Sequence, residues 1–92
     1  MNSAAHQRPR LAKRVRLQMD NITGKPVLLY QETVLLLNHS GYQVLRLCDG
    51  TQTITDIVET LAKEYQMAEP TLSRDVSEFV GAISQQGLIE WV

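Results

Sequence analysis

The spacing of hydrophobic residues along the chain changes near its middle. In residues 14–20 apolar and polar positions alternate, which is typical of a strand with one buried face. The turn-forming segment 21–24 separates this strand from a second apolar run, Pro26–Tyr30, which begins at a proline that a strand start tolerates. Only Gln31-Glu32 precedes a third run, Val34–Leu37. Such short connections predict an antiparallel meander of three strands in sequence order.

The third run differs from the first because Val34, Leu35, Leu36 and Leu37 are all apolar. A strand with one face in water should alternate instead. A chain of 92 residues buries only a little over ~60% of its unfolded surface, so few apolar residues can be spared from burial. The last strand of a meander is also an open edge of the sheet. We therefore expect some further element or partner to cover this strand.

The second half of the chain has the spacing of three short helices. Asn38 or Ser40 can cap the first helix, which we expect to end at Asp49-Gly50. Thr53 and Asp56 have the spacing of a capping box and begin the second. The third has Pro70 in its first turn and stops at Gly87. The apolar faces comprise Tyr42, Val44, Leu45, Leu47 and Cys48 in the first helix, Ile54, Ile57, Val58, Leu61 and Tyr65 in the second, and Leu72, Val76, Phe79, Val80 and Ile83 in the third.

These elements predict an α+β domain, a three-stranded antiparallel β-meander followed by three α-helices, resembling a winged helix-turn-helix. Residues 88–92 form a short terminal strand or a tail that packs Trp91. Residues 1–10 have no apolar period and contain Pro9, so we expect a flexible basic tail before a domain that spans residues 11–92. The helices can cover only one face of the sheet.

Charge is distributed unevenly along the chain. Five basic residues precede the first acidic one, whereas four basic and ten acidic residues follow from Leu17 onward. Residues 53–86, which include any recognition helix, contain two basic residues against six acidic ones, a net charge of −4. Because lysine and arginine supply much of the affinity for phosphates, this surface should repel DNA. A winged-helix nucleic-acid-binding protein remains the alternative that the architecture allows, with the basic N-terminal segment in support.

The composition favours a cytoplasmic protein. No stretch approaches the ~20 apolar residues of a membrane span, and residues 1–10 lack the apolar core of a secretory signal. The single cysteine, Cys48, cannot form an internal disulfide, which agrees with a reducing compartment.

Catalytic and metal-binding patterns are weak. Cys48, His39 and a nearby aspartate, Asp49 or Asp56, are the residue types of a thiol nucleophile and its base. Cys48, however, lies in an apolar helical run, where cysteine behaves as a small hydrophobic residue. His6, His39 and Cys48 lack the spacing of metal ligands, and the glycines are scattered singly rather than gathered in a phosphate-binding loop. We expect no enzyme activity, no cofactor and no metal.

An open strand edge exposes unpaired backbone donors and acceptors. An extended peptide could add to Val34–Leu37 as a fourth strand, with its side chains in a cleft beside the third helix. The same edge could instead be covered by a homodimer, by strand exchange or by residues 88–92. The hydrophobic pattern alone favours neither a bound peptide nor these three alternatives.

The segments RPRLAKRVRLQMD, PVLLYQETVLLLN, VLRLCDGTQTITDIVETLAKEY and RDVSEFVGAISQQGLI resemble the PqqD family, the small peptide chaperones of pyrroloquinoline quinone biosynthesis. The resemblance covers nearly everything after the tail, so it implies that residues 11–92 are a peptide-recognition domain. It implies binding of the precursor peptide PqqA and its presentation to PqqE, a radical S-adenosylmethionine enzyme that cross-links a glutamate and a tyrosine in the peptide. A recognition element of another peptide-modifying pathway would share this pattern.

The resemblance also implies where the peptide lies. Related recognition domains hold a leader peptide along the third strand and against the third helix. Transferred to this chain, backbone pairing falls to Val34, Leu35, Leu36 and Leu37. The opposite wall falls to a helical stripe of Asp75, Phe79, Ala82 and Gln86.

Overall fold

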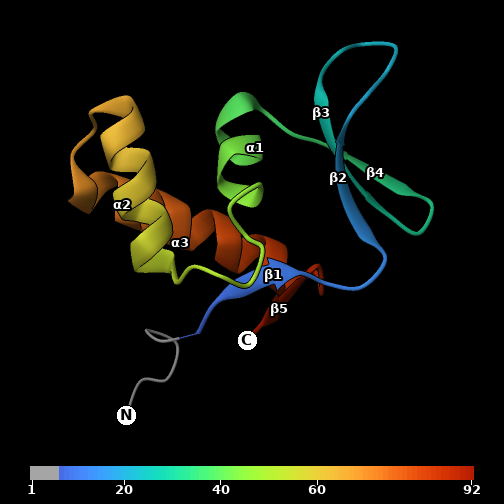
Figure 1. Ribbon diagram of the computed structural model, residues 1–92. Helices are drawn as coiled ribbons and strands as arrows, with labels where there is room; N and C mark the ends of the chain where they lie inside the picture. Colours follow the sequence, from blue (N-terminus) through green and yellow to red (C-terminus); the bar gives the residue numbers. More distant parts are fainter. Residues whose placement is uncertain (1–6) are drawn as a thin grey trace.

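The computed structural model describes residues 7–92 (Figure 1). Its strands are β1 (Pro9–Leu11), β2 (Val15–Met19), β3 (Pro26–Tyr30), β4 (Thr33–Leu36) and β5 (Ile89–Trp91), and its helices are α1 (His39–Leu45), α2 (Ile54–Tyr65) and α3 (Glu69–Gln85). The predicted α+β fold, a three-stranded meander followed by three helices, is confirmed. A second, two-stranded sheet of β1 and β5 was not predicted.

The main sheet has the order β2-β3-β4 and is antiparallel throughout. The β2–β3 turn includes Gly24 with φ +71°, where a glycine avoids the strain of a side chain. Thr23 donates hydrogen bonds from its hydroxyl and its N–H to the Asp20 carboxylate, and these bonds lower the pKa of Asp20. The β3–β4 turn is formed by Gln31-Glu32, as expected from the short connection. Within residues 7–92, β4 pairs only with β3 and forms one edge of the sheet.

The helix starts follow local signals in the sequence. The predicted capping box of α2 is confirmed, because the Thr53 side chain accepts from the Asp56 N–H at 3.1 Å and the Asp56 side chain accepts from the Thr53 N–H at 3.0 Å. Asn38 is the N-cap of α1, which decides between the two expected caps. Pro70 lies in the first turn of α3, where its missing N–H has no helical partner to lose. Gly87, with φ +80°, follows the end of α3.

The predicted end of the first helix is wrong. α1 stops at Leu45, and residues 46–47 form a turn before the chain reaches Asp49-Gly50. The physical reason is a competing long-range pairing. The Gly50 N–H donates to the Pro9 carbonyl at 2.9 Å, and Asp49 forms an isolated β-bridge with Arg10. These residues therefore connect α1 to β1 rather than extend the helix.

The predicted boundary of the N-terminal tail also needs correction. Pro9 and Arg10, expected in a flexible segment of residues 1–10, belong to β1 and pair with Trp91 and Glu90 of β5. The Pro9 side chain is fully buried. Residues 1–6 of the expected tail lie outside the described residues. Pro9 and Arg10 therefore belong to the folded domain, as part of β1.

The β1–β5 sheet brings the two ends of the described chain together (Figure 1). Arg8 and Val92 continue the ladder beyond the strands, with backbone hydrogen bonds of 2.9 Å from Arg8 to Val92 and 2.8 Å in return. The Arg10 guanidinium pairs with the Glu90 carboxylate at 3.0 Å on the exposed side. The predicted terminal strand is confirmed, but it does not cover β4, because β5 pairs with β1.

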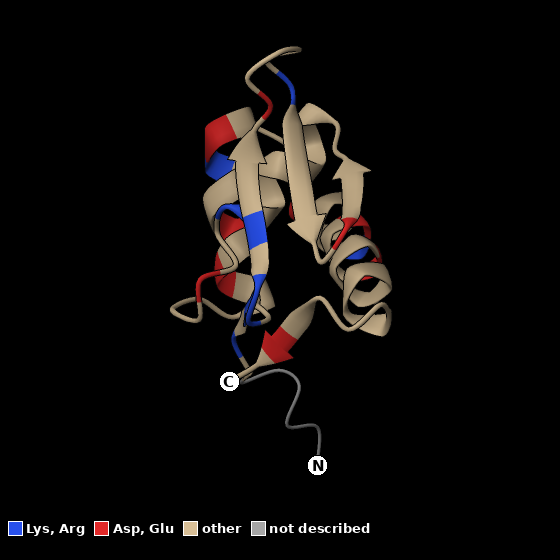
Figure 2. Cartoon of the chain, turned by 90° about the vertical axis from the view of Figure 1, so that its right-hand side faces the viewer, with Lys and Arg blue, Asp and Glu red and all other residues tan. Residues whose placement is uncertain are grey.

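One core joins the inner face of the meander to the three helices. Its fully buried side chains include Leu28 of β3, Ile57 of α2 and Val80 of α3. In Figure 2 the helices lie behind the meander, so the sheet is covered on one face as predicted. Within residues 7–92 no helix is long and apolar enough to cross a membrane.

Candidate functional site

Alternate residues of β4 point their backbone N–H groups to the free edge of the sheet. The register pairs Leu35 with Leu28 and Val34 with Leu29. The Leu37 N–H donates to the Pro26 carbonyl at 3.1 Å, so Leu37, although it follows the last residue of β4, still bonds to β3. Alternate residues of an antiparallel strand point their N–H groups to opposite sides. The N–H groups of Leu35 and Leu37 therefore face β3, and those of Val34 and Leu36 face outward.

The side chains of β4 and Leu37 divide in the same way. Leu35 and Leu37 are half-buried and pack against the core. Val34 and Leu36 project from the other face with 57% and 79% of their surface exposed. The apolar run is thus covered on one face by the protein's own helices, and its second face is open among the described residues.

In Figure 2 α3 lies behind the sheet, on the side of the view where β4 forms the edge. Of the predicted stripe on this helix, Phe79 is half-buried, whereas Asp75, Ala82 and Gln86 are exposed. Exposure leaves three of the four stripe residues free to contact a partner, and their part in peptide binding stays a prediction. Gln86 is the C-cap residue of α3, so the stripe extends to the very end of the helix.

A pocket of about 330 Å³ lies where the chain leaves β4 and enters α1. Its walls come from the start of α1, the end of α2 and the first half of α3. Asp75 and Phe79 of the predicted stripe line it, whereas Ala82 and Gln86 do not. The other lining residues are Asn38, His39, Ser40, Gly41, Gln43, Val44, Leu61, Tyr65, Met67, Leu72 and Val76.

The width of this pocket depends on a close approach between α1 and α3. Gly41 of α1 is buried, and a Cβ atom there would lie 3.1 Å from Cζ of Phe79 and 3.1 Å from Oδ1 of Asn38. That Asn38 oxygen already accepts the Gly41 N–H at 2.7 Å. A glycine therefore lets the helix N-terminus approach the aromatic ring while its cap is kept.

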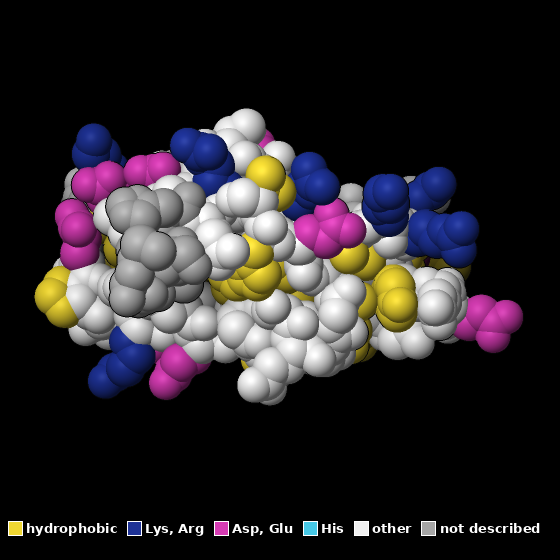
Figure 3. Space-filling view, turned by 90° about the horizontal axis from the view of Figure 1, so that it is seen from below, with side chains coloured by type: hydrophobic (Ala, Val, Ile, Leu, Met, Phe, Trp, Pro, Cys, Tyr) yellow, Lys and Arg dark blue, Asp and Glu magenta, His cyan; other side chains and the backbone are white. Residues whose placement is uncertain are grey.

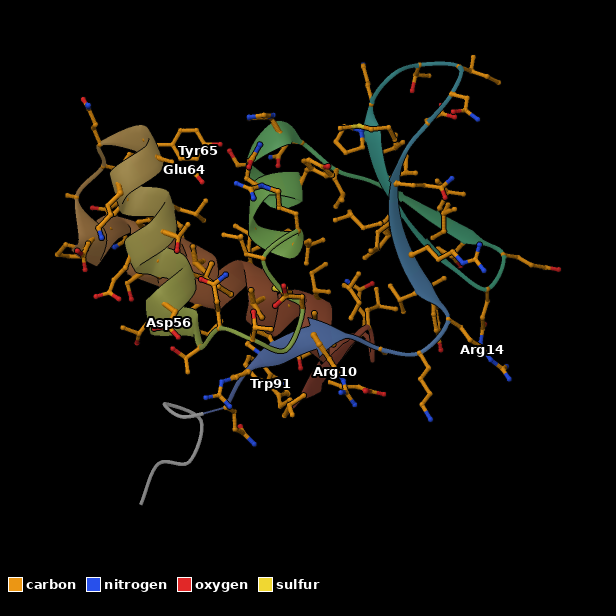
Figure 4. All side chains as sticks on the ribbon, in the orientation of Figure 1. Arg10, Arg14, Asp56, Glu64, Tyr65 and Trp91 are labelled. Atoms are coloured by element: carbon orange, nitrogen blue, oxygen red, sulfur yellow. The ribbon has the colours of Figure 1, made fainter. Side chains whose placement is uncertain are left out.

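The contributions of α1 and α2 to the pocket were not predicted from the sequence. Tyr65 was assigned to the core face of its helix, yet it is 42% exposed and lines the pocket beside Met67. In Figure 4 Tyr65 lies at the end of α2 next to the start of α1. The sequence signal that could have indicated the pocket is the apolar pair Tyr65 and Met67 at the end of a helix, where an exposed position would ordinarily be polar.

The cysteine expected in the core is buried there. The Cys48 thiol donates to the Val44 carbonyl at 3.4 Å and lies in the apolar cluster with Leu45 and Ile57. Burial, followed by the neighbouring Asp49 charge, raises the pKa of the Cys48 thiol to about 12. A thiol with this pKa stays protonated at neutral pH and is a poor nucleophile.

His39 does not join a metal-binding group in the part of the chain that the structure describes. It is exposed at the start of α1, and its Nε2 lies 3.4 Å from the amide nitrogen of Gln43. No group of three or more potential ligands occurs in residues 7–92, and His6 lies outside this range.

The fold resembles several solved structures. The solution NMR structure of the PqqD truncation of Methylobacterium extorquens PqqCD, a stand-alone recognition element for ribosomally synthesised and post-translationally modified peptides (RiPPs), superposes with a TM-score of 0.79 at 29% identity, over 98% of this chain and 95% of that one. TbiB1 in complex with the TbiA(beta) leader peptide gives 0.73 at 25% identity, over 88% and 94%. The chain thus has the fold of a RiPP recognition element.

The chain belongs to the PqqD family, because the family model of coenzyme PQQ synthesis protein D matches residues 26–89. The PqqA binding protein of Xanthomonas campestris pv. campestris strain B100 is 35% identical over 81 residues, which cover 88% of each chain. The bifunctional coenzyme PQQ synthesis protein C/D of Methylorubrum extorquens is 30% identical over 82 residues, 89% of this chain but only 22% of that longer protein. The family inferred from the sequence segments is therefore confirmed.

Proposed function

We propose that the protein is a cytoplasmic, non-catalytic chaperone of pyrroloquinoline quinone biosynthesis, which binds the precursor peptide PqqA by strand addition to β4 and presents it to the radical S-adenosylmethionine enzyme PqqE. The observation that carries the proposal is the edge of β4, where the N–H groups of Val34 and Leu36 point outward beside α3. Relatives that bear the name PqqA binding protein support the identity of the peptide.

The proposed complex continues the existing sheet. The peptide pairs antiparallel with β4, as every other strand of the meander does with its neighbour. Its backbone bonds to Val34 and Leu36, and its inward side chains contact the α3 stripe of Asp75, Phe79, Ala82 and Gln86. In this orientation the peptide residues that precede the paired segment reach the end of β4 near Asn38, where a large apolar side chain fits the pocket.

The expected affinity is moderate. If a strand-like peptide buries ~400 Å² of apolar area, the gross gain is ~10 kcal/mol at roughly 25 cal/mol/Å². Association and ordering of the peptide cost several kcal/mol or more, so the backbone hydrogen bonds must contribute. Binding in the micromolar range, about −8 kcal/mol, would suit a carrier that passes its peptide on.

The chaperone itself contributes no reacting group in this proposal. The buried, protonated Cys48 supports this, since it reaches neither the β4 edge nor the residues that line the pocket. Cys48→Ala should therefore leave the turnover of PqqA by PqqE nearly unchanged. A large loss of turnover, with folding and peptide affinity intact, would contradict a non-catalytic role.

Proline substitutions along the strand test the proposal. Proline removes a backbone donor, and the two sets of N–H groups have different partners. Leu35→Pro and Leu37→Pro remove donors to β3 and should lower the melting temperature strongly. Val34→Pro and Leu36→Pro remove outward donors and should keep the fold while weakening PqqA binding at least tenfold in calorimetric titration, roughly 1.4 kcal/mol. An unrelated leader peptide serves as the specificity control.

Strand addition is wrong if Val34→Pro and Leu36→Pro are folded and bind PqqA as tightly as the parent protein. A second copy of the chain would then be the alternative occupant of the edge, detectable as a dimer in sedimentation that the same substitutions dissociate. A steeply salt-dependent complex with duplex DNA, weakened by Arg74→Ala, would instead support the winged-helix alternative.

A further inference from the structure

The meander has a second face, opposite the helices. Register places Arg16, Leu29 and Val34 in one row across β2, β3 and β4, and Gln18, Val27 and Leu36 in the next row. These rows point away from the core, which contains the alternating residues Leu17, Leu28 and Leu35 instead. We call Arg16, Gln18, Val27, Leu29, Val34 and Leu36 the outer face. Val27 at its centre is buried, with 4% of its surface exposed, and the other five are exposed or half-buried around it. In Figure 2 it faces the viewer.

The outer face has an apolar side and a basic side. Val34 and Leu36 are exposed on β4, and Leu29 is half-buried beside them. Arg16 is exposed on β2, at the other edge of the sheet. None of the three strands contains an acidic residue, and Figure 2 shows a basic residue on β2 only. An exposed apolar strip beside a cationic edge is typical of a protein-binding surface.

The basic side continues into the turn before β2. Lys13, Arg14 and Arg16, which we call the basic corner, are all exposed and form no salt bridge with another residue of the described range. Arg10, by contrast, is paired with Glu90. Figure 3 shows several basic side chains close together toward the right of the view, whereas basic and acidic side chains are mixed toward the left, and Figure 4 shows Arg14 extending outward at this corner.

A bound peptide would extend the outer face instead of covering it. Strand addition uses the edge of β4, and successive side chains of an added strand point alternately to α3 and to the opposite side. The second set of peptide side chains would therefore lie next to Val34 and Leu36. The outer face then displays four strands, one of which is the peptide, to any further partner.

We propose that the outer face docks the enzyme that modifies the peptide, through an enzyme surface that is apolar at its centre and acidic at its rim. The inference rests on the proposed function. The apolar centre would cover Leu29, Val34 and Leu36, and the acidic rim would meet the basic corner. A second copy of this chain fits less well, because its own outer face contains Arg16 and none of its three strands contains an acidic residue that could meet the basic corner.

The turn at the basic corner allows a sharp test. The Val15 N–H donates to the Ala12 carbonyl at 3.1 Å, which closes a turn over Lys13 and Arg14. Arg14 has φ +70°, a conformation that glycine adopts without strain. Arg14→Gly should therefore raise the melting temperature while it removes a docking cation. A loss of enzyme binding in a stabilised variant cannot be attributed to unfolding.

The experiment measures the affinity of the full chain, loaded with PqqA, for PqqE at low and high salt. Arg14→Gly and Arg16→Ser should each weaken binding about fivefold at low ionic strength, with a smaller effect at high salt. Both should leave PqqA affinity unchanged, because β2 is separated from β4 by β3. Lys63→Ser, which removes an exposed charge of α2, is the matched control and should have no effect.

Each other outcome overturns the inference in a recognisable way. Unchanged enzyme affinity in both arginine variants would exclude the outer face while leaving peptide binding by β4 intact. An equal loss of PqqA affinity would assign the basic corner to the peptide. A parent protein that binds PqqA but not PqqE would overturn both the inference and the presentation step of the proposed function.

Discussion

Phe79 of α3 and Gly41 of α1 approach so closely that a single added methyl group at Gly41 would lie 3.1 Å from the phenyl ring. Both residues line the pocket at the end of β4. The contact links the capped start of α1 to the wall of α3 that is proposed to hold the peptide. The fit of these two helices is therefore part of the candidate site.

Gly41→Ala should destabilise the protein by about 1 kcal/mol and weaken peptide binding. Alanine would gain roughly 0.5–1 kcal/mol from its higher helix propensity, but the added Cβ must displace the Phe79 ring or the Asn38 cap, at a cost of about 1–3 kcal/mol. Thermal unfolding and calorimetric titration with PqqA measure the two effects. Gly81→Ala is the matched control in α3, where nothing lies within 4 Å of the new Cβ. It should stabilise the protein slightly, and a stabilising Gly41→Ala would show that the contact is loose.

Met67 offers a direct test of the pocket. It is 46% exposed at the pocket wall, so Met67→Lys should leave stability nearly unchanged and weaken PqqA binding by placing a charge where an apolar side chain is proposed to sit. Met19→Lys is the matched control, because Met19 is 47% exposed at the end of β2 and does not line the pocket. Equal affinities for the two variants would exclude the pocket from the peptide site.

The capping box of α2 should contribute about 1 kcal/mol to stability. Thr53→Ala removes the side-chain acceptor for the Asp56 N–H, and a domain of this size should lose about 4–8 °C in melting temperature. Thr55→Ala, at an exposed position in the same first turn, should change the melting temperature little. If the two substitutions act alike, helix propensity and not the cap determines the stability of this turn.

Cys48 should make stability depend on alkaline pH. Its pKa is raised to about 12 in the folded protein, whereas an unfolded cysteine titrates near the ordinary value of 9.0. Below pH ~9 both states keep the proton, and above it only the unfolded state loses it, so this part of the stability declines by up to ~1.4 kcal/mol per pH unit toward pH 12. The difference in unfolding free energy between the parent and Cys48→Ala should therefore shrink from pH 8 to pH 10. A constant difference would mean that the thiol ionises normally in the folded state.

Most elements could be predicted because the residues that determine them lie within a few positions of one another in the sequence. Alternation identified β2, the Thr53–Asp56 spacing identified the start of α2, and Gly87 marked the end of α3. β1 was not predicted, because Pro9–Leu11 becomes a strand only by pairing with β5, which is 80 residues away in the sequence at the Arg10–Glu90 pair. The same pairing explains the misplaced end of α1, since Gly50 bonds to Pro9 instead of capping a helix.

The candidate site was predictable in part for the same reason. The β4 edge follows from the order of a meander, so the run Val34–Leu37 could be named in advance, although the sequence did not reveal which residues of the run face outward. The pocket could not be predicted, because it depends on how three helices meet around Gly41 and Phe79. The role of the α3 stripe stays a prediction.

The backbone bonds between Arg8 and Val92 have a consequence for protein fusions. A linker attached directly before β1 or after β5 would start from the same place. Figure 4 shows Trp91 well separated from Tyr65, which lines the pocket. A module joined there by a short flexible linker would have an effective concentration on the order of millimolar, whichever end carries it. Its tether would start well away from the pocket. The order of modules in such a fusion should therefore be interchangeable, because Arg8 and Val92 lie side by side near the two ends of the described range.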